Sequence, residues 1–302
     1  MYRGCMTDLS DRFAAPCARQ LYRTLQEGFT RTILLAQQES PGRDRHDREM
    51  EWIEALTGQL PAIRGLDLIH DDFDGVAERA LRWHDRGGIV TICWHTGVEG
   101  PGYRDSQQEH PCLEEIVTPG TRLNSRWLHR LEGAVQALDR LQRAKVPVLW
   151  RPYHEFDGRW FWWGKDGAEA FRALWRMTWK TLTEDFGQHH LIWVLGFADD
   201  ARGEWYPGDD VTDVVGSDTY KGVTAHATAW RKLRARYPGK PAAFHECGQL
   251  TEPDTFFREG AVWSWVMPWH GQWLTDRQRV ETLRTLYADP RFLTLSGLRM
   301  SK

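Results

Sequence analysis

Ionisable side chains and large aromatic rings follow directly after a short apolar strand in residues 146–164, which read VPVLWRPYHEFDGRWFWWG. Arg151, His154 and Glu155 come first, and aromatic residues then occupy positions 160–163. A lone His–Glu pair is usually a surface ion pair and a run of tryptophans is usually core, but their combination at a strand end favours a site. The C–H faces of a pyranose pack on indole rings, and its hydroxyls need charged or amide partners, so this stretch suits the binding of sugars.

A second carboxylate stands in a comparable position, because Glu246 directly follows residues 241–245 (PAAFH), another predicted strand. Hydrolysis of an acetal needs two carboxyl groups, one to protonate the leaving oxygen and one to meet the developing oxocarbenium ion. A separation of about 5–5.5 Å would mean direct attack with retention, and a wider gap would leave room for water and inversion. Glu155 and Glu246 are therefore the candidate catalytic pair.

The elements that position this pair are apolar runs that recur at the spacing of a repeating strand–helix unit. Strands are predicted at 32–36, 65–70, 88–94, 146–150, 190–196, 211–217, 241–245 and 260–267. Helices are predicted at 44–56, 73–85, 124–144, 168–186, 225–237 and 275–287. The strands are almost continuously apolar, as parallel strands covered on both faces should be. The pattern predicts an α/β fold, a (β/α)8 TIM barrel, with residues 1–302 as a single catalytic domain and residues 1–28 as an N-terminal extension packed on the barrel.

In such a barrel, polar residues at the carboxyl ends of the strands point into the active-site face. His95 follows the third predicted strand, Asp218 and Tyr220 follow the sixth, and Trp269 lies just beyond the eighth. Strands four and seven face each other across the barrel mouth, which permits a close pair of glutamates. Residues 96–123 are rich in glycine and proline and are predicted to be a loop, and loops of that length in a compact domain are usually functional.

Composition excludes several classes of partner. The formal net charge is −3 and no block of lysine and arginine is present, so a nucleic acid is not expected. No apolar run approaches the length of about 18 residues that a membrane-spanning helix needs. The chain has 17 tryptophans, several times the usual share, and this excess favours a carbohydrate cleft.

Five cysteines without CxxC spacing indicate neither a disulfide framework nor a zinc site, although Cys5 and Cys17 could pair. The histidines lack a metal-ligand context, so neither a metal nor a cofactor is expected. The first residues lack the apolar core of a signal peptide, so the protein is expected to be cytoplasmic as the sequence stands, or secreted if a leader has been removed. No oligomeric state is indicated.

The segment RPYHEFDGRWFWWG resembles the signature of glycoside hydrolase family 26, the β-mannanase family. The resemblance implies that Glu155 is the general acid/base. It also implies that His154 contacts the substrate and the nucleophile, and that Trp160 lines the sugar subsite on the non-reducing side of the cleavage point. Trp162 and Trp163 are expected to be structural.

Further segments resemble the same family between about residues 37 and 273. PAAFHECG implies that Glu246 is the nucleophile, and GIVTICWH implies that His95 binds substrate. VVGSDTY implies that Asp218 and Tyr220 lie beside the nucleophile, with Tyr220 hydrogen-bonded to Glu246. WVMPWHGQW implies that Trp269 forms a stacking floor for a sugar.

The resemblance implies a retaining hydrolase that cleaves β-1,4-mannosidic linkages in mannan or manno-oligosaccharides by double displacement. Two alternatives stay open: a hydrolase of another β-glycan, such as β-1,3-xylan or mixed-linkage β-glucan, and a carbohydrate-binding barrel without catalysis. Retention of both glutamates argues against the second alternative. The chain departs from the family pattern at Phe156–Asp157, at residues 196–199 and at His245, which leaves the identity of the glycan open.

Overall fold

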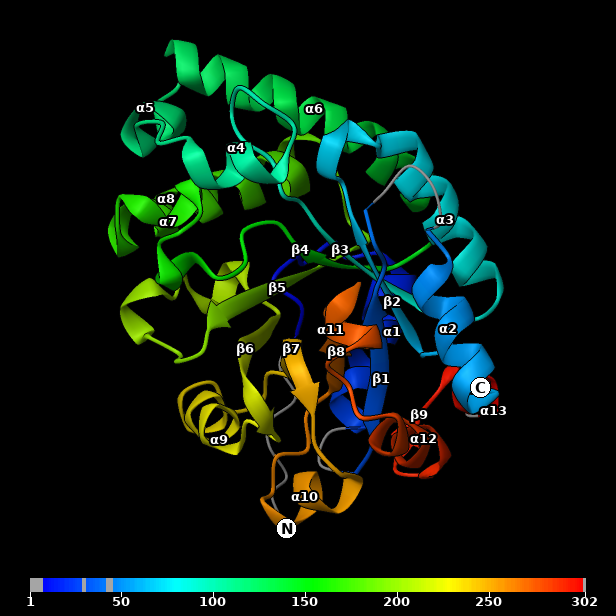
Figure 1. Cartoon of the computed structure of the whole chain (residues 1–302). Helices are drawn as coiled ribbons and strands as arrows, with labels where there is room; N and C mark the ends of the chain where they lie inside the picture. The colour runs from blue at the N-terminus through cyan, green and yellow to red at the C-terminus, as the bar shows by residue number, and fades with distance from the viewer. Residues whose placement is uncertain (1–7, 29–30, 42–45, 301–302) are drawn as a thin grey trace.

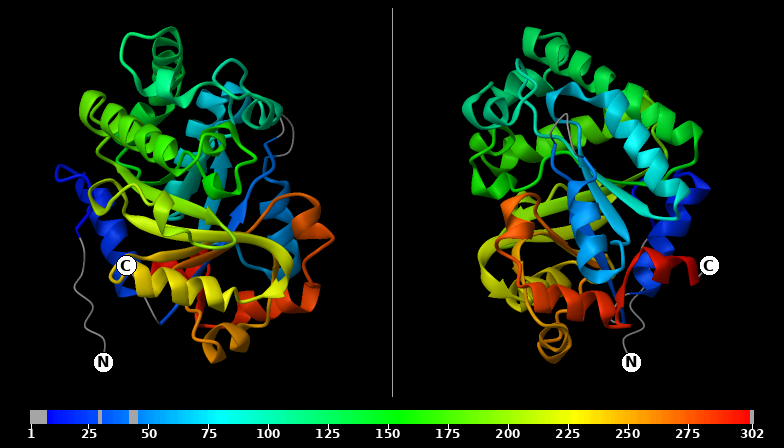
Figure 2. Two further views of the ribbon diagram at one scale, coloured as in Figure 1. Left: turned by 90° about the vertical axis from the view of Figure 1, so that its left-hand side faces the viewer. Right: turned by 45° about the vertical axis from the view of Figure 1, so that its right-hand side comes forward.

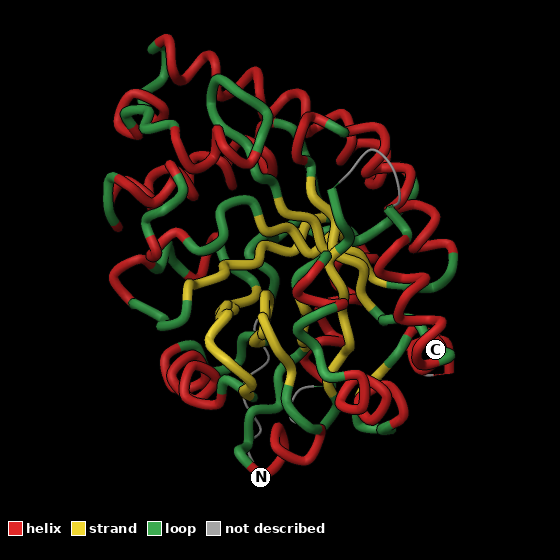
Figure 3. The backbone as a smooth tube through the Cα atoms, viewed as in Figure 1, coloured by secondary structure: helices red, strands yellow, loops and turns green. Residues whose placement is uncertain are grey.

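The computed structural model describes residues 8–28, 31–41 and 46–300, and its strands form a closed parallel barrel. The sheet order is β2-β3-β4-β5-β6-β7-β8-β1-β9, and β1 also pairs with β2, so the first eight strands close on themselves. Figure 3 shows these strands at the centre of the molecule and the helices around them. The predicted (β/α)8 barrel is therefore confirmed.

The strands are β1 Ile33–Gln38, β2 Ile63–Asp67, β3 Ile89–Cys93, β4 Val148–Arg151, β5 Leu191–Ala198, β6 Val214–Thr224, β7 Ala242–Leu250, β8 Trp265–Pro268 and β9 Phe292–Leu293. The helices are α1 Pro16–Glu27, α2 Arg48–Thr57, α3 Phe73–Asp85, α4 Tyr103–Gln108, α5 Leu113–Val117, α6 Arg122–Arg143, α7 Trp162–Lys165, α8 Ala168–Lys180, α9 Ala227–Arg236, α10 Pro253–Arg258, α11 Gln272–Thr275, α12 Val280–Ala288 and α13 Leu295–Met300. Their arrangement can be followed in Figure 1.

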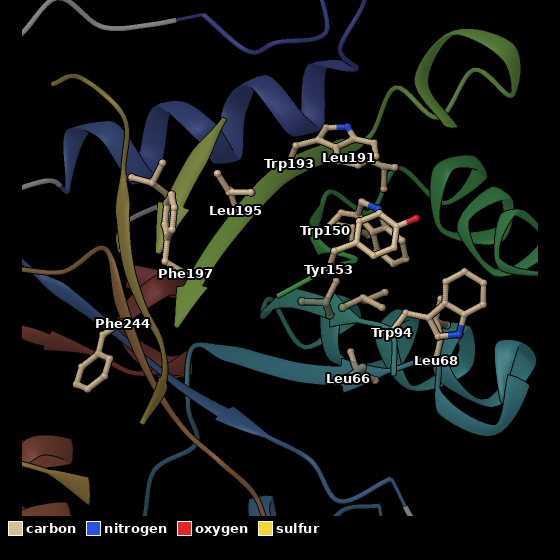
Figure 4. Close-up of a cluster of buried hydrophobic side chains, with 14 of the residues drawn as sticks. Leu66, Leu68, Trp94, Trp150, Tyr153, Leu191, Trp193, Leu195, Phe197 and Phe244 are labelled. Carbon is tan, nitrogen blue, oxygen red and sulfur yellow. The ribbon is translucent and has the colours of Figure 1, made fainter. Parts of the chain in front are cut away.

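Each barrel strand buries both of its faces, because successive side chains point to opposite sides of the sheet. In β5, Trp193 and Leu195 belong to the large apolar cluster between the barrel and its helices, part of which Figure 4 shows. Ile192 and Val194, which alternate with them, belong to a second cluster inside the barrel. This double burial explains why the strands are almost continuously apolar in sequence.

Helix α1 packs against the interior cluster at one end of the barrel. Its Ala18, Leu21 and Leu25 join that cluster, and the Tyr22 hydroxyl donates a hydrogen bond of 3.2 Å to the carbonyl oxygen of Asp213. In the left panel of Figure 2, α1 (blue) lies at the end of the barrel opposite α11 (orange). The helix therefore covers the amino-terminal end of the barrel and leaves the carboxyl ends of the strands free for a site.

Several predicted strand boundaries are wrong, because the backbone conformation and the packing of the folded chain end or shorten these strands. The second strand starts at Ile63, two residues before the predicted start, and ends at Asp67 because His70 and Asp71 adopt positive φ angles of 61° and 56°. The eighth strand covers only Trp265–Pro268, because the apolar residues before it pack as a buried turn in which the N–H of Trp263 bonds to Ala261.

The segment 96–123, predicted to be a loop, contains the short helices α4 and α5. The Glu109 carboxylate holds the turn before α4 by accepting hydrogen bonds from the backbone N–H groups of Val98, Glu99 and Gly100. The glycines and prolines obscure the helical pattern in the sequence, and side-chain-to-backbone hydrogen bonds such as these stabilise the segment.

No helix in the described ranges is long and apolar enough to cross a membrane. Cys17, Cys93, Cys112 and Cys247 are free thiols, and the possible partner Cys5 lies outside the described residues. Residues 1–7 of the predicted N-terminal extension lie outside them as well.

Replacing Leu25 with alanine should lower the free energy of unfolding by about 2–4 kcal/mol, because it would leave a cavity between α1 and the barrel interior. The matched control is Arg23→Ala on the exposed face of the same helix, which should change it by less than about 0.5 kcal/mol. Urea unfolding curves measure both. Equal effects of the two substitutions would contradict the packing of α1 on the barrel.

Candidate active site

The carboxyl ends of the strands surround a cavity of about 530 Å³. Of the predicted site residues, those that line it are His95, His154, Glu155, Tyr220, Glu246 and Trp269. Asp218 does not line it and is buried against the backbone of Glu246, whose N–H donates to Asp218 Oδ1 at 3.0 Å. Trp160 stands at the rim with 43% of its surface exposed. The structure therefore gathers the predicted residues around one site.

Glu155 lies in the turn after β4 and has a left-handed backbone, with φ 53° and ψ 28°. This conformation is unfavourable for a residue with a Cβ and persists where surrounding contacts impose it. The Glu155 N–H donates to the carbonyl of Gly196 at 2.8 Å, and Asp157 Oδ1 accepts from the N–H of Ala198 at 2.7 Å. Both bonds attach the turn to β5, which fixes the side chain of Glu155 at the cavity.

Two glycines allow this turn to close. A Cβ on Gly158 would lie 2.1 Å from the ring of Trp160, and a Cβ on Gly164 would lie 1.9 Å from the carbonyl oxygen of Phe156. Because the glycines let the chain approach so closely, the Trp160 indole lies beside the turn, and its N–H donates a 2.9 Å hydrogen bond to Glu155 Oε2. Trp160 was predicted as a subsite wall, and it also holds the candidate acid/base.

Glu246 lies within β7 and accepts hydrogen bonds from two side chains, one buried and one half-buried. The Arg151 guanidinium donates to Oε1 at 2.5 Å, and the Tyr220 hydroxyl donates to Oε2 at 2.7 Å, which is the bond expected from the sequence. His154 Nε2 lies 3.6 Å from Oε1. These donors aim the carboxylate and stabilise its negative charge.

One carboxyl oxygen each from Glu155, Asp218 and Glu246 lie within 4.8 Å of one another. This close approach of Glu155 and Glu246 favours the direct-attack arrangement, with carboxyl groups about 5–5.5 Å apart, over the inverting arrangement, which needs about 6.5–9.5 Å.

The environments of these carboxyl groups differ. Burial, followed by the charge of Glu246, raises the pKa of Glu155 to about 8. Burial and the same charge raise the pKa of Asp218 well above its usual range. Only Glu246 has both a direct cation and a hydroxyl donor, so the site favours an ionised Glu246 beside a protonated Glu155.

The Tyr220 hydroxyl keeps its proton at neutral pH. Burial and the neighbouring Glu246 raise the pKa of Tyr220 well above its usual range, so the hydroxyl remains a donor. Burial, followed by the charge of Arg151, lowers the pKa of His154 well below its usual range, so this imidazole is neutral.

Several cavity residues were missed by sequence reasoning: Asp67, His70, Tyr103, Phe161, His270 and Trp273. Asp67 is the last residue of β2 and was hidden by the misplaced second strand. His270 and Trp273 share the aromatic stretch after β8 with Trp269, a signal that could have identified them. Trp162 and Trp163 are fully buried and donate from their indole N–H groups to the carbonyls of Thr96 and His154.

Two groups of side chains among the described residues are close enough to share a metal ion. In one of them, Asp67 and His95 already form a 2.6 Å hydrogen bond beside Cys93. In the other, Arg151 forms ion pairs with Asp218 and Glu246. Because each group has its partners within the chain, we assign a metal to neither.

Replacing Glu246 with glutamine should lower the pKa of Glu155 from about 8 towards its ordinary value, because the largest charge that raises this pKa is removed. Burial remains, so the value should stay above about 4.5. A pH titration of the Glu155 carboxyl carbon by NMR measures the change. The control is Glu169→Gln at an exposed position on α8, and an unchanged Glu155 titration in Glu246→Gln would refute the coupling.

The sequence of the chain is similar to that of a known protein family and of individual relatives. A sequence model of a protein family, described as glycosyl hydrolase family 26, matches residues 11–296 of the chain. A mannan endo-1,4-β-mannosidase of Thermothelomyces thermophilus is 29% identical over 316 residues, which cover 96% of this chain and 63% of the relative. One from Bacillus subtilis (strain 168) is 31% identical over 238 residues, which cover 69% of this chain and 63% of the relative. The chain thus spans less than two thirds of the length of both relatives.

Solved structures agree over nearly the whole chain. A Podospora anserina β-(1,4)-mannanase superposes with a TM-score of 0.89 at 27% identity, covering 99% of this chain and 70% of that one. A β-mannanase from a symbiotic protist of the termite Reticulitermes speratus, solved with a gluco-manno-oligosaccharide, gives a TM-score of 0.87 at 26% identity and covers 98% of this chain and 99% of that one. With the family model matched from residue 11 to residue 296, the chain belongs to glycoside hydrolase family 26.

Proposed function

We propose that this chain is a retaining glycoside hydrolase that cleaves β-1,4-mannosidic linkages in mannan or manno-oligosaccharides. The observation that carries the proposal is the pair of carboxyl groups of Glu155 and Glu246, with oxygens within 4.8 Å in unequal environments. The names of the relatives, which are mannan endo-1,4-β-mannosidases, support the choice of β-1,4-mannan.

The mechanism is a double displacement. In the first step, Glu246 attacks the anomeric carbon while Glu155 gives its proton to the glycosidic oxygen, and the leaving sugar departs. In the second step, Glu155 takes a proton from water, the water oxygen bonds to the anomeric carbon, and the ester bond to Glu246 breaks. The first step leaves Glu155 as the base that the second step needs, and the second step restores both glutamates to their starting states.

The surrounding residues prepare this exchange. Arg151 and Tyr220 hold Glu246 ionised and in place for attack. Asp218 orients the same residue through its backbone N–H. Trp160 aims Glu155, and its exposed ring offers a face for the sugar that precedes the cleavage point.

Recognition of the sugar uses the rest of the cavity lining. Trp269 and His95 stand with their ring centroids 5.9 Å apart, so an apolar ring and a polar ring meet at one wall. Trp269 supplies a stacking surface, and His95 and His154 supply nitrogens for the hydroxyls.

Glu155→Gln and Glu246→Gln should each reduce hydrolysis of mannohexaose by at least about 100-fold while the fold is kept, since general acid catalysis alone contributes about 10²–10⁴-fold. Product chromatography and circular dichroism measure the two effects, with Glu169→Gln as the matched control. Near-normal turnover in either variant would overturn the assignment, and unchanged mannohexaose with measurable binding to the wild-type protein would identify a binding barrel instead. The same assay on xylan and mixed-linkage glucan tests the other β-glycans.

A nitrophenyl mannobioside separates the two roles, because its leaving group needs little protonation. Glu155→Gln should release a burst of nitrophenol equal to the enzyme concentration and then turn over slowly, as expected when the covalent intermediate accumulates. Glu246→Gln should show no burst. Bursts in both variants, or in neither, would contradict the assigned roles.

The pH dependence follows from the pKa of about 8 for Glu155. Glu155 must be protonated for the first step, so the alkaline limb of kcat/KM should lie near pH 8, with a tenfold fall per unit above it. The Trp160 hydrogen bond favours the ionised form and lowers this pKa, so Trp160→Phe should move the alkaline limb to higher pH. Trp179→Phe, which removes an indole bond to Ser10 far from the cavity lining, should not move it. A limb that stays in place in Trp160→Phe would refute this contact.

A further inference from the structure

Asp67 forms three hydrogen bonds with its surroundings, and their division between its two oxygens is specific. Oδ1 accepts from the backbone N–H groups of His95 at 3.0 Å and Ile69 at 3.1 Å. Oδ2 lies 2.6 Å from His95 Nδ1. Burial acts to raise the pKa of Asp67, but the neighbouring imidazole of His95 and these hydrogen bonds outweigh it, and the pKa is lowered. The carboxylate is therefore ionised and offers only acceptors.

The ring of His95 is also held by its neighbours. The imidazole packs against the rings of Tyr103, His154, Phe161 and Trp269, with centroid distances between 4.5 and 5.9 Å. His95 lines the cavity. Because Nδ1 faces Asp67, Nε2 is the ring nitrogen left to meet a ligand.

We propose that Asp67 is a positioning residue that keeps the proton of neutral His95 on Nδ1, so that Nε2 accepts a hydrogen bond from a sugar hydroxyl in the cavity. An ionised carboxylate at 2.6 Å has no proton to give, so Nδ1 must be the donor. In the neutral ring, the other nitrogen is then an acceptor. The ligand that fits is a pyranose whose hydroxyl points its proton at the wall formed by β2 and β3. This inference deepens the proposed function and rests on it for its catalytic consequence.

The substitution Asp67→Asn tests the proposal because the backbone constrains how the amide lies. Two backbone N–H groups require an acceptor at the position of Oδ1, so the amide oxygen occupies it and the NH₂ group faces His95 Nδ1. The proton of His95 must then move to Nε2, which becomes a donor. The same substitution in the Asp–His pair of serine proteases leaves the geometry intact and selects the wrong tautomer.

Two readouts are expected to change together. ¹⁵N NMR should show the Nδ1–H tautomer of His95 in the wild-type protein and the Nε2–H tautomer in Asp67→Asn. The kcat/KM for mannohexaose should fall at least about tenfold, the cost of about one misplaced hydrogen bond. In a His95→Ala background, Asp67→Asn should cost less than twofold, because the group through which it acts is gone.

A matched control exists on the surface. Asp166 forms a similar pair with His110 Nε2 at 2.6 Å and accepts from the N–H of Leu113, and neither Asp166 nor His110 lines the cavity. Asp166→Asn should leave kcat/KM unchanged.

The proposal is overturned if wild-type His95 carries a proton on Nε2, whether as the other neutral tautomer or as the doubly protonated ring, and this measurement needs no variant. It is also overturned if Asp67→Asn exchanges the tautomer without lowering kcat/KM, or if it costs as much activity without His95 as with it. A wild-type protein that leaves mannohexaose intact would refute the proposed hydrolase while the NMR result still decides the tautomer. In that case, mannohexaose affinity replaces kcat/KM as the second readout.

Discussion

The ion pair between Arg151 and Glu246 is the interaction on which the rest of the site depends. Three carboxyl groups are buried with oxygens within 4.8 Å of one another, an arrangement that would be strongly unfavourable if all were ionised. The fully buried guanidinium compensates one negative charge and places it on Glu246 at 2.5 Å. That charge then helps to keep the proton on Glu155. One cation thus assigns different protonation states to two residues of the same type.

The barrel supplies the rigidity that this division of charge needs. Arg151 is the last residue of β4, and Glu246 lies within β7, so both come from strands whose two faces are buried. Glu155 lies on a turn instead, and hydrogen bonds to β5 hold that turn in a left-handed conformation. Helix α1 covers the opposite end of the barrel. Well-packed elements on either side thus support the strained backbone of Glu155.

Much of this could be predicted from the sequence, because the signals are local. The apolar runs of parallel strands and the polar residues that follow them identified the barrel and the positions of Glu155 and Glu246. Asp67 was missed because the apolar run continues through Leu68 and Ile69, beyond the end of the strand.

The backbone conformation that follows the end of β2 depends on a residue far away in the sequence. Asp71, in a left-handed conformation, is held by two 2.9 Å bonds from the Arg130 side chain on α6. No pattern within a few residues encodes that contact. The different roles of Glu155 and Glu246 were expected from the sequence, but the distances that set their charges were not, because they join residues that are far apart in sequence.

In the proposed mechanism, Glu246 forms a covalent bond to the sugar before Glu155 activates a water molecule. The most direct measurement is mass spectrometry of the protein after incubation with a 2-deoxy-2-fluoro mannobioside that carries a good leaving group, because the fluorine slows release of the glycosyl-enzyme. We expect one fluorinated mannobiosyl unit per chain, located by proteolysis on the peptide that contains Glu246. An active protein that forms no adduct and gives the inverted anomer as its first product would contradict it.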